Sequence, residues 1–156
     1  MLQKLIVFLV FTFLLGGCVE PTLPAYDFDK LLNAYGEVWN SGDLAPLDTL
    51  VSTDFDYRVN SSGPYSGVSP LMRSIESTRN PFNNFSLVLK EKSEVSDTVC
   101  LITWEITGNR KADGEAFVSE GFSVIFHADG KITGEWISFS DMDWVTGLGY
   151  TVSPPE

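Results

Sequence analysis

Apolar residues recur at steps of three and four from residue 26 onward, a spacing that places them on one face of a helix. Asp27 can cap the start of this helix and Ser41-Gly42 ends it. Asp43 opens a second, shorter helix whose apolar residues again share one face. We expect these two helices to form a hairpin. Their apolar faces carry Phe28, Leu32, Tyr35, Trp39, Leu44, Leu47 and Leu50.

The next segment, residues 54–59, alternates strictly between polar and apolar side chains, as a half-buried strand does. Ser69-Pro70 supplies an N-cap and a first-turn proline for a third helix, which ends before Pro81. Everything after it is predicted to be β structure, with Asp129-Gly130 as a hairpin turn. The four strands expected there are 85–94, 98–107, 116–127 and 131–140. Helices and strands are segregated along the chain, which predicts an α+β fold.

Composition narrows the classes of function. The chain has 21 acidic and 10 basic residues and a net charge of −11, so its surface repels nucleic acid and anionic lipid headgroups. With one histidine and two cysteines it has no cluster at metal-ligand spacing, and no glycine-rich phosphate loop is present. We therefore expect no metal, no cofactor and no nucleic-acid partner. Apolar neighbours predict that Cys100 is a buried, inert thiol.

The first residues have the parts of a secretory signal. Lys4 and the amino terminus are positive, and the apolar run that follows, residues 5–15, reaches roughly 16 Å as a helix, far short of the ~30 Å hydrocarbon core. Leu15-Gly16-Gly17-Cys18 resembles the lipobox of bacterial lipoproteins. The resemblance implies a cleaved signal peptide over residues 1–17 and a lipid on Cys18. The alternative is an ordinary secretory signal with an incidental cysteine.

Lipidation implies an address and a tether. Residues 18–25 would be the lipidated cysteine and a short extended tether that contains two prolines. The protein is then expected in the cell envelope, anchored to the membrane through Cys18. Because Val19 follows the cysteine instead of aspartate, the resemblance favours the periplasmic face of the outer membrane if the source is Gram-negative.

Several short motifs, in order, resemble the SnoaL-like polyketide cyclases of the nuclear transport factor 2-like superfamily. The resemblance implies a domain over residues 26–150 followed by a flexible tail, residues 151–156. It also implies a cystatin-like roll, in which a strongly bent antiparallel sheet wraps three helices from the N-terminal half into a cone with a largely apolar pocket. The motifs are residues 37–44 with 53–55, Tyr65-Ser66-Gly67, residues 129–132, Glu135-Trp136 and Gly147-Leu148-Gly149.

The catalytic residues of that family are mostly missing here. A late aspartate serves those cyclases as general base, and the corresponding position is Ser140, with Asp141 and Asp143 as the nearest carboxylates. Family histidines correspond to Arg58 and to residues 108–110. The single histidine, His127, precedes a hairpin turn and is expected to be solvent-exposed. Family-type cyclase activity is therefore not expected.

Aromatic residues are the candidates for the pocket walls. Trp39, Tyr57, Trp104 and Trp136 would lie on the inner faces of the cone, where their N–H and O–H groups can orient a ligand. Arg58 is a charged candidate, and Glu105 is another. Because Arg58 shares a strand face with Asp54 and Asp56, an exposed position is favoured; if it were buried, it would favour an anionic ligand.

Three hypotheses for function remain open. The first is a membrane-anchored lipoprotein whose SnoaL-like domain binds a small, mainly apolar ligand. The second is a degenerate isomerase or cyclase that uses Asp141 or Asp143 as general base. The third is an envelope interaction module that forms a homodimer through the sheet.

Overall fold

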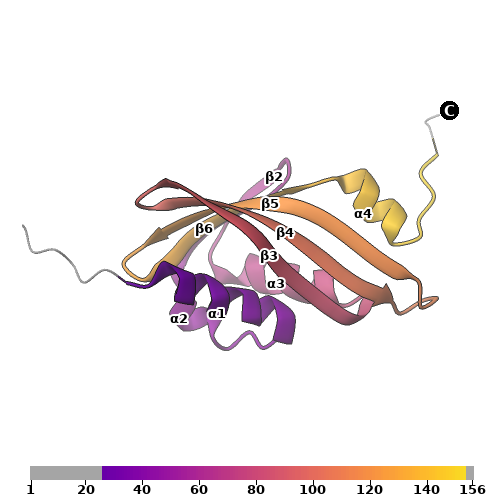
Figure 1. Cartoon of the computed structure of the whole chain (residues 1–156), viewed down its shortest axis with the longest axis horizontal. Coiled ribbons are helices and arrows are strands. Elements are labelled where there is room, and N and C mark those ends of the chain that lie inside the picture. Colours follow the sequence, from indigo (N-terminus) through magenta and orange to yellow (C-terminus); the bar gives the residue numbers. More distant parts are fainter. Residues whose placement is uncertain (1–25, 154–156) are drawn as a thin grey trace, which may run out of the picture.

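The structure is a computed structural model that describes residues 26–153. One curved sheet of six strands has α1, α2 and α3 along one face, and α4 lies at one end of it (Figure 1). The α+β prediction is confirmed. The elements are α1 (Phe28–Ser41), α2 (Leu47–Leu50), β1 (Val51–Val59), β2 (Ser62–Ser66), α3 (Val68–Arg79), β3 (Phe82–Ser96), β4 (Val99–Arg110), β5 (Ala116–Ala128), β6 (Lys131–Phe139) and α4 (Asp141–Gly147).

The predicted signal peptide, Cys18 and the tether up to residue 25 lie outside the described residues, as do residues 154–156 of the expected tail. Thr151, Val152 and Ser153 are exposed and belong to no helix or strand. Among residues 26–153, no helix is both long and apolar enough to cross a membrane.

Local signals for α1 act as predicted. Asp27 accepts a hydrogen bond from the backbone N–H of Lys30 at 3.0 Å, which satisfies one of the free donors of the first turn. Gly42 ends the helix in the left-handed conformation (φ 73°), which glycine adopts without steric cost. Between these ends the helix buries an apolar face that includes Leu32, Tyr35 and Trp39.

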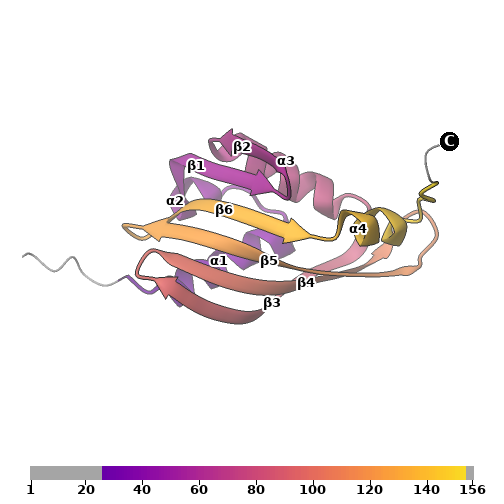
Figure 2. The ribbon, with the colours of Figure 1, turned by 90° about the horizontal axis from the view of Figure 1, so that it is seen from above.

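The strand order is β2-β1-β6-β5-β4-β3 (Figure 2). The expectation of a wholly antiparallel sheet is wrong at one place, because β1 and β6 pair in parallel, with Arg58 opposite Trp136. No tight hairpin joins these two strands, so no turn imposes an antiparallel direction on them. The long connection through α3 and β3–β5 brings β6 back beside β1 in the same direction.

Two elements were not expected. The segment after Asn60 is a hairpin turn into β2, which pairs antiparallel with β1 and is exposed throughout. The chain after Ser140 forms α4 instead of ending in β structure, and Ser140 caps this helix by accepting a hydrogen bond from the N–H of Asp143 at 3.2 Å. A serine followed three residues later by an acid is the local signal for this helix start.

A register shift in the β5–β6 pair decides which side chains of β6 face the helices. The shift lies between Phe126 and His127, opposite the segment from Ile132 to Gly134. Beyond this bulge the alternation changes phase, so that Glu135 is buried while Trp136 is exposed on the outer face.

Hydrophobic side chains form two clusters. The larger one packs α1, α2 and α3 against the inner face of the sheet and includes Cys100, which is fully buried as predicted. Burial raises the pKa of its thiol. The second cluster joins α4 to the far end of the sheet through Phe82, Trp104, Ile106, Phe117, Phe139, Trp144 and Leu148.

Candidate ligand cavity

A cavity of about 260 Å³ lies between the helices and the inner face of the sheet. Side chains from α1, α3, β1, β3–β6 and α4 line it, and most of them are apolar or aromatic. The lining residues of α1, β4 and β5 are buried, whereas Ser77, Thr78, Phe139 and Trp144 are partly or largely exposed. The cavity therefore opens between α3 and α4.

Inside the cavity the apolar lining is interrupted by a buried carboxyl group. Glu135 is only 5% exposed and accepts a hydrogen bond from the hydroxyl of Tyr35 at 2.5 Å. Burial raises the pKa of Glu135, while hydrogen bonds from Tyr35 and Ser123 act in the opposite direction. The elements α1, β5 and β6 thus place two neutral donors around one acid.

Two tyrosines flank this acid and stay protonated. Burial raises the pKa of Tyr35 well above its ordinary value, and the negative charge of Glu135 raises it further. The same two causes raise the pKa of Tyr57, whose hydroxyl donates to Ser74 at 2.6 Å. Both phenols therefore act as hydrogen-bond donors in the cavity, and neither acts as a base near neutral pH.

A second hydrogen bond orders the β4 side of the cavity. The indole Nε1 of Trp104 donates to the hydroxyl of Ser123 at 3.1 Å, and both side chains are buried. Because the oxygen of Ser123 accepts this bond, its proton remains available to Glu135, and a hydrogen bond from Ser123 lowers the pKa of that carboxyl. This chain of contacts fixes the position of the Trp104 ring on the cavity wall.

Glu135 is the only carboxylate among the described residues that line the cavity, and no lysine, arginine or histidine joins it there. Within residues 26–153, no group of three histidine, cysteine or acidic side chains is arranged to hold a metal ion. The arrangement can hold an apolar molecule, and it offers a single acidic group and several neutral donors to that molecule.

Of the residues singled out from the sequence for the pocket, Trp39, Tyr57 and Trp104 line the cavity. Trp136 does not: it is 38% exposed on the outer face of the sheet, because the β6 bulge reverses its direction. Its predicted place is taken by Glu135, one residue earlier. The sequence contained one signal for Glu135: an acidic residue inside a mainly apolar predicted strand.

Arg58 also lies outside the cavity. Its guanidinium carbon sits 4.4 Å from the centre of the Trp136 ring, and Nη2 is 3.4 Å from a carboxylate oxygen of Asp56. Glu105 is on the same outer face and pairs with Lys90 at 3.1 Å. These charged side chains pair with one another on the outer face of the sheet, so they do not support an anionic ligand in the cavity.

The two late aspartates lie in the first turn of α4 and do not line the cavity. Asp141 is exposed and accepts a hydrogen bond from the side-chain amide of Asn60 at 2.5 Å. Asp143 is also exposed, and neither residue contributes to the cavity wall. The geometry therefore does not bring Asp141 or Asp143 to a bound molecule.

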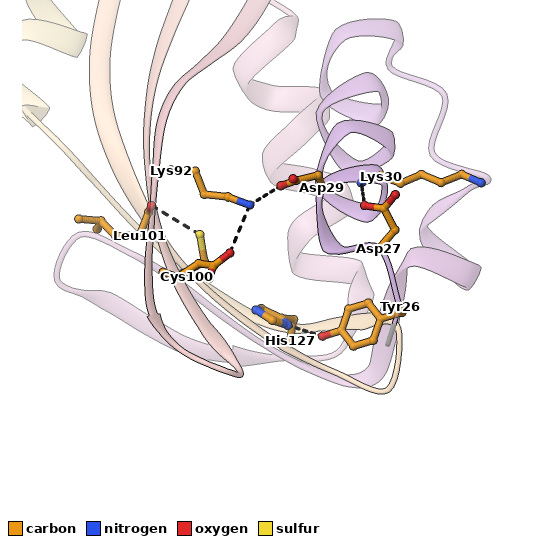
Figure 3. A network of polar contacts seen from close by, with 9 residues as sticks. Tyr26, Asp27, Asp29, Lys30, Lys92, Cys100, Leu101 and His127 are labelled. Carbon is orange, nitrogen blue, oxygen red and sulfur yellow. Dashed lines mark hydrogen bonds and ion pairs between the residues drawn. The ribbon is translucent and has the colours of Figure 1, made fainter. Parts of the chain in front are cut away.

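His127 is the residue whose predicted environment is wrong. It is 7% exposed, not solvent-exposed, because Phe28 stacks on its ring with centroids 3.9 Å apart. The hydroxyl of Tyr26 hydrogen-bonds its Nδ1 (Figure 3). The register of the hairpin turns this side chain inward, under the start of α1.

Several solved structures share this fold. TsrD from Streptomyces laurentii superposes with a TM-score of 0.67 and 18% identity, over 80% of this chain and 98% of that one. A proposed polyketide cyclase from Acidithiobacillus ferrooxidans gives 0.67 and 17%, over 81% and 97%. IdmH from Streptomyces antibioticus, a proposed polyketide cyclase, gives 0.68 and 15%, over 80% and 100%.

Sequence comparison supports the same relationship at the level of the family. No curated protein sequence matches the chain. The model of the SnoaL-like domain matches residues 32–135, which span α1 to Glu135 in β6 and contain most of the cavity wall. This match covers more than half of the chain, and the chain therefore belongs to the family of SnoaL-like domains.

Proposed function

We propose that this domain binds a small, mainly apolar molecule in its cavity. The observation that carries the proposal is a cavity of about 260 Å³ that has apolar walls and one buried polar group, Glu135. Packed protein interiors retain few voids larger than a water molecule. Concave, mostly apolar cavities with a few placed polar groups are the usual form of ligand sites.

Binding can be followed through the protein's own fluorescence, because Trp39 and Trp104 line the cavity. Small cyclic alcohols, ketones and amines are expected to change this fluorescence saturably. Ser77→Trp, at the mouth, should block binding. Glu76→Trp is the matched control, because Glu76 is also exposed on α3 but does not line the cavity. A crystal structure with side chains filling the cavity would contradict the proposal.

We also propose that the domain is anchored to a membrane of the cell envelope by lipid on Cys18, at the outer membrane if the source has one. Leu15-Gly16-Gly17-Cys18 supports this proposal.

The described chain enters α1 at the end of the molecule opposite α4 (Figure 1), and Trp144 of α4 is at the cavity mouth. Seven tether residues reach at most roughly 25 Å. The mouth would then point away from the membrane.

The anchor is tested by Cys18→Ser. Replacement should abolish incorporation of radiolabelled palmitate and move the protein from the membrane fraction to the soluble fraction, with its circular dichroism spectrum unchanged. Cys100→Ser is the control, since Cys100 is buried inside the domain. Unchanged fractionation of the Cys18 variant, or loss of its fold, would refute the proposed boundary.

A second candidate function is dimerisation through the outer face of the sheet. This face exposes large apolar side chains, which on a monomer mark interaction sites when they are contiguous. They are Val88, Val118, Phe122 and Trp136. A self-complementary patch on one face forms a two-fold dimer. Sedimentation equilibrium should then show a dimer that Phe122→Glu disrupts; a monomer at every concentration would exclude it.

A further inference from the structure

We propose that the molecule bound in the cavity is a small apolar amine whose ammonium group pairs with Glu135. The inference rests on the proposed function, because it names the chemical class of the ligand for the same cavity. Three features carry it: an acid without a positive partner, a wall of aromatic rings, and the negative charge of the chain.

The first feature is the missing positive partner of Glu135. Its hydrogen-bond donors, Tyr35 and Ser123, are neutral hydroxyls, and no cationic side chain lines the cavity in the described part of the chain. A buried carboxylate is costly unless a positive group pairs with it. The two hydroxyl donors favour the ionised form of the acid, but burial outweighs them and its pKa stays above the ordinary value, so the carboxylate gains from a positive partner. A ligand ammonium supplies the charge that the protein does not.

The second feature is the aromatic wall. Tyr35, Trp39, Tyr57 and Trp104 line the same cavity as Glu135. The faces of such rings attract cations, and desolvation strengthens this attraction. Arginine and lysine side chains that lie over rings in the described structure do so elsewhere, on Trp136, Phe85 and Phe28. The cavity rings therefore remain available to a cationic ligand.

The third feature acts at longer range. A chain with a net charge of −11 attracts cations and repels anions, and a cleft in a low-dielectric wall focuses this field. A ligand carboxylate would meet both this field and the like charge of Glu135. A neutral alcohol or ketone avoids the repulsion, yet leaves the buried acid without a counter-charge. The amine is the class that satisfies all three features.

Four ligands of similar size test this choice: benzylamine, benzyl alcohol, benzaldehyde and benzoate. Affinities are measured by titration calorimetry on the full chain at pH 7.5. Charge-assisted hydrogen bonds are stronger than neutral ones, so benzylamine is expected to bind about tenfold or more tightly than benzyl alcohol. In Glu135→Gln this preference should disappear, because the variant has no negative charge to pair with the ammonium group.

A second variant keeps the test decisive if Glu135→Gln does not fold. Tyr35→Phe removes a neutral donor but leaves the carboxylate, so the preference for benzylamine should persist in it. Equal or tighter binding of alcohol, aldehyde or benzoate would overturn the amine inference and leave apolar binding intact. An amine preference that survives Glu135→Gln would overturn it as well. If none of the four binds, both the inference and the proposed function fail.

Discussion

The hydroxyl of Tyr26 is hydrogen-bonded to Nδ1 of His127, 101 positions further along the chain. Phe28 stacks on the same imidazole. Lys92 of β3 pairs with Asp29 in the first turn of α1 (Figure 3). The start of the domain, residues 26–29, is thus attached to both β3 and β5. The point where the proposed tether meets the domain is therefore held against the sheet.

Removing the Tyr26 hydroxyl should weaken this connection. Tyr26→Phe is expected to lower the free energy of unfolding by about 0.5–1.5 kcal/mol, the usual net value of a hydrogen bond. Tyr150→Phe is the control, since Tyr150 is 66% exposed at the other end of the chain and should change nothing. Urea denaturation of the two variants measures the difference. Equal stabilities would show that the Tyr26 contact contributes nothing in solution.

The single histidine allows a direct test of its environment. Burial lowers the pKa of His127 from its ordinary value of 6.5, the charge of Lys92 acts in the same direction, and that of Glu94 opposes it. The folded state therefore favours neutral imidazole, and the stability so gained is lost as the pH falls from 6.5 through the lower folded pKa. Only one imidazole titrates in a proton NMR spectrum.

The matching stability measurement uses His127→Phe. This variant keeps a ring against Phe28 but does not titrate. The wild type should lose stability relative to it below pH 6.5, by about 1.4 kcal/mol for each unit by which the pKa is lowered. An imidazole pKa above 6.5 would contradict the buried position of this side chain.

Glu135 should give the opposite dependence on pH. Because its folded pKa is raised above the ordinary 4.5, its proton is held more tightly in the folded state. The associated stability is fully present below pH 4.5 and is lost as the pH rises through the folded pKa. The difference in unfolding free energy between wild type and Glu135→Gln, measured in urea at several pH values, should therefore fall above pH 4.5.

All other titrating groups are common to the two proteins, so this difference isolates Glu135. A difference that stays constant with pH would contradict the raised pKa. A saturating apolar amine should reduce the loss, because a paired carboxylate no longer resists ionisation.

Replacing glycine by alanine is expected to change the stability of the fold in opposite directions at two positions. A Cβ on Gly121 would contact the ring of Trp104 and lie 2.5 Å from the backbone oxygen of Ser138. Gly121→Ala should therefore cost about 1–3 kcal/mol of stability and move the Trp104 ring in the cavity wall. Gly36→Ala meets only Leu89, at 3.6 Å, and adds a better helix former to α1.

Gly36→Ala should accordingly stabilise the fold by about 0.8–1 kcal/mol. Thermal unfolding of both variants provides the comparison, with near-ultraviolet circular dichroism reporting on Trp104. Equal changes in thermal stability for the two substitutions would show that a methyl group at Gly121 fits without a steric clash.

Periodicity along the chain was enough for those elements whose exposure alternates without interruption. Helical spacing placed Tyr35 and Trp39 on the buried face of α1, and strand alternation placed Tyr57 on the inner face of β1. Capping residues such as Asp27 act over three or four positions, so their signals are contained in the sequence itself. The α+β class and much of the aromatic wall followed from these local rules.

The polar part of the cavity depended on contacts between distant segments. A bulge in the β5–β6 pair, opposite the segment from Ile132 to Gly134, exchanged the faces of Glu135 and Trp136. The hydroxyl of Tyr35 on α1 donates to Glu135 on β6, 100 positions further along the chain. The strand that carries Glu135 is placed by its parallel pairing with β1. The sequence by itself determined which side chains can face a core; the tertiary structure alone decided which of them meet, because strand register and pairing are set by packing between segments far apart in the chain.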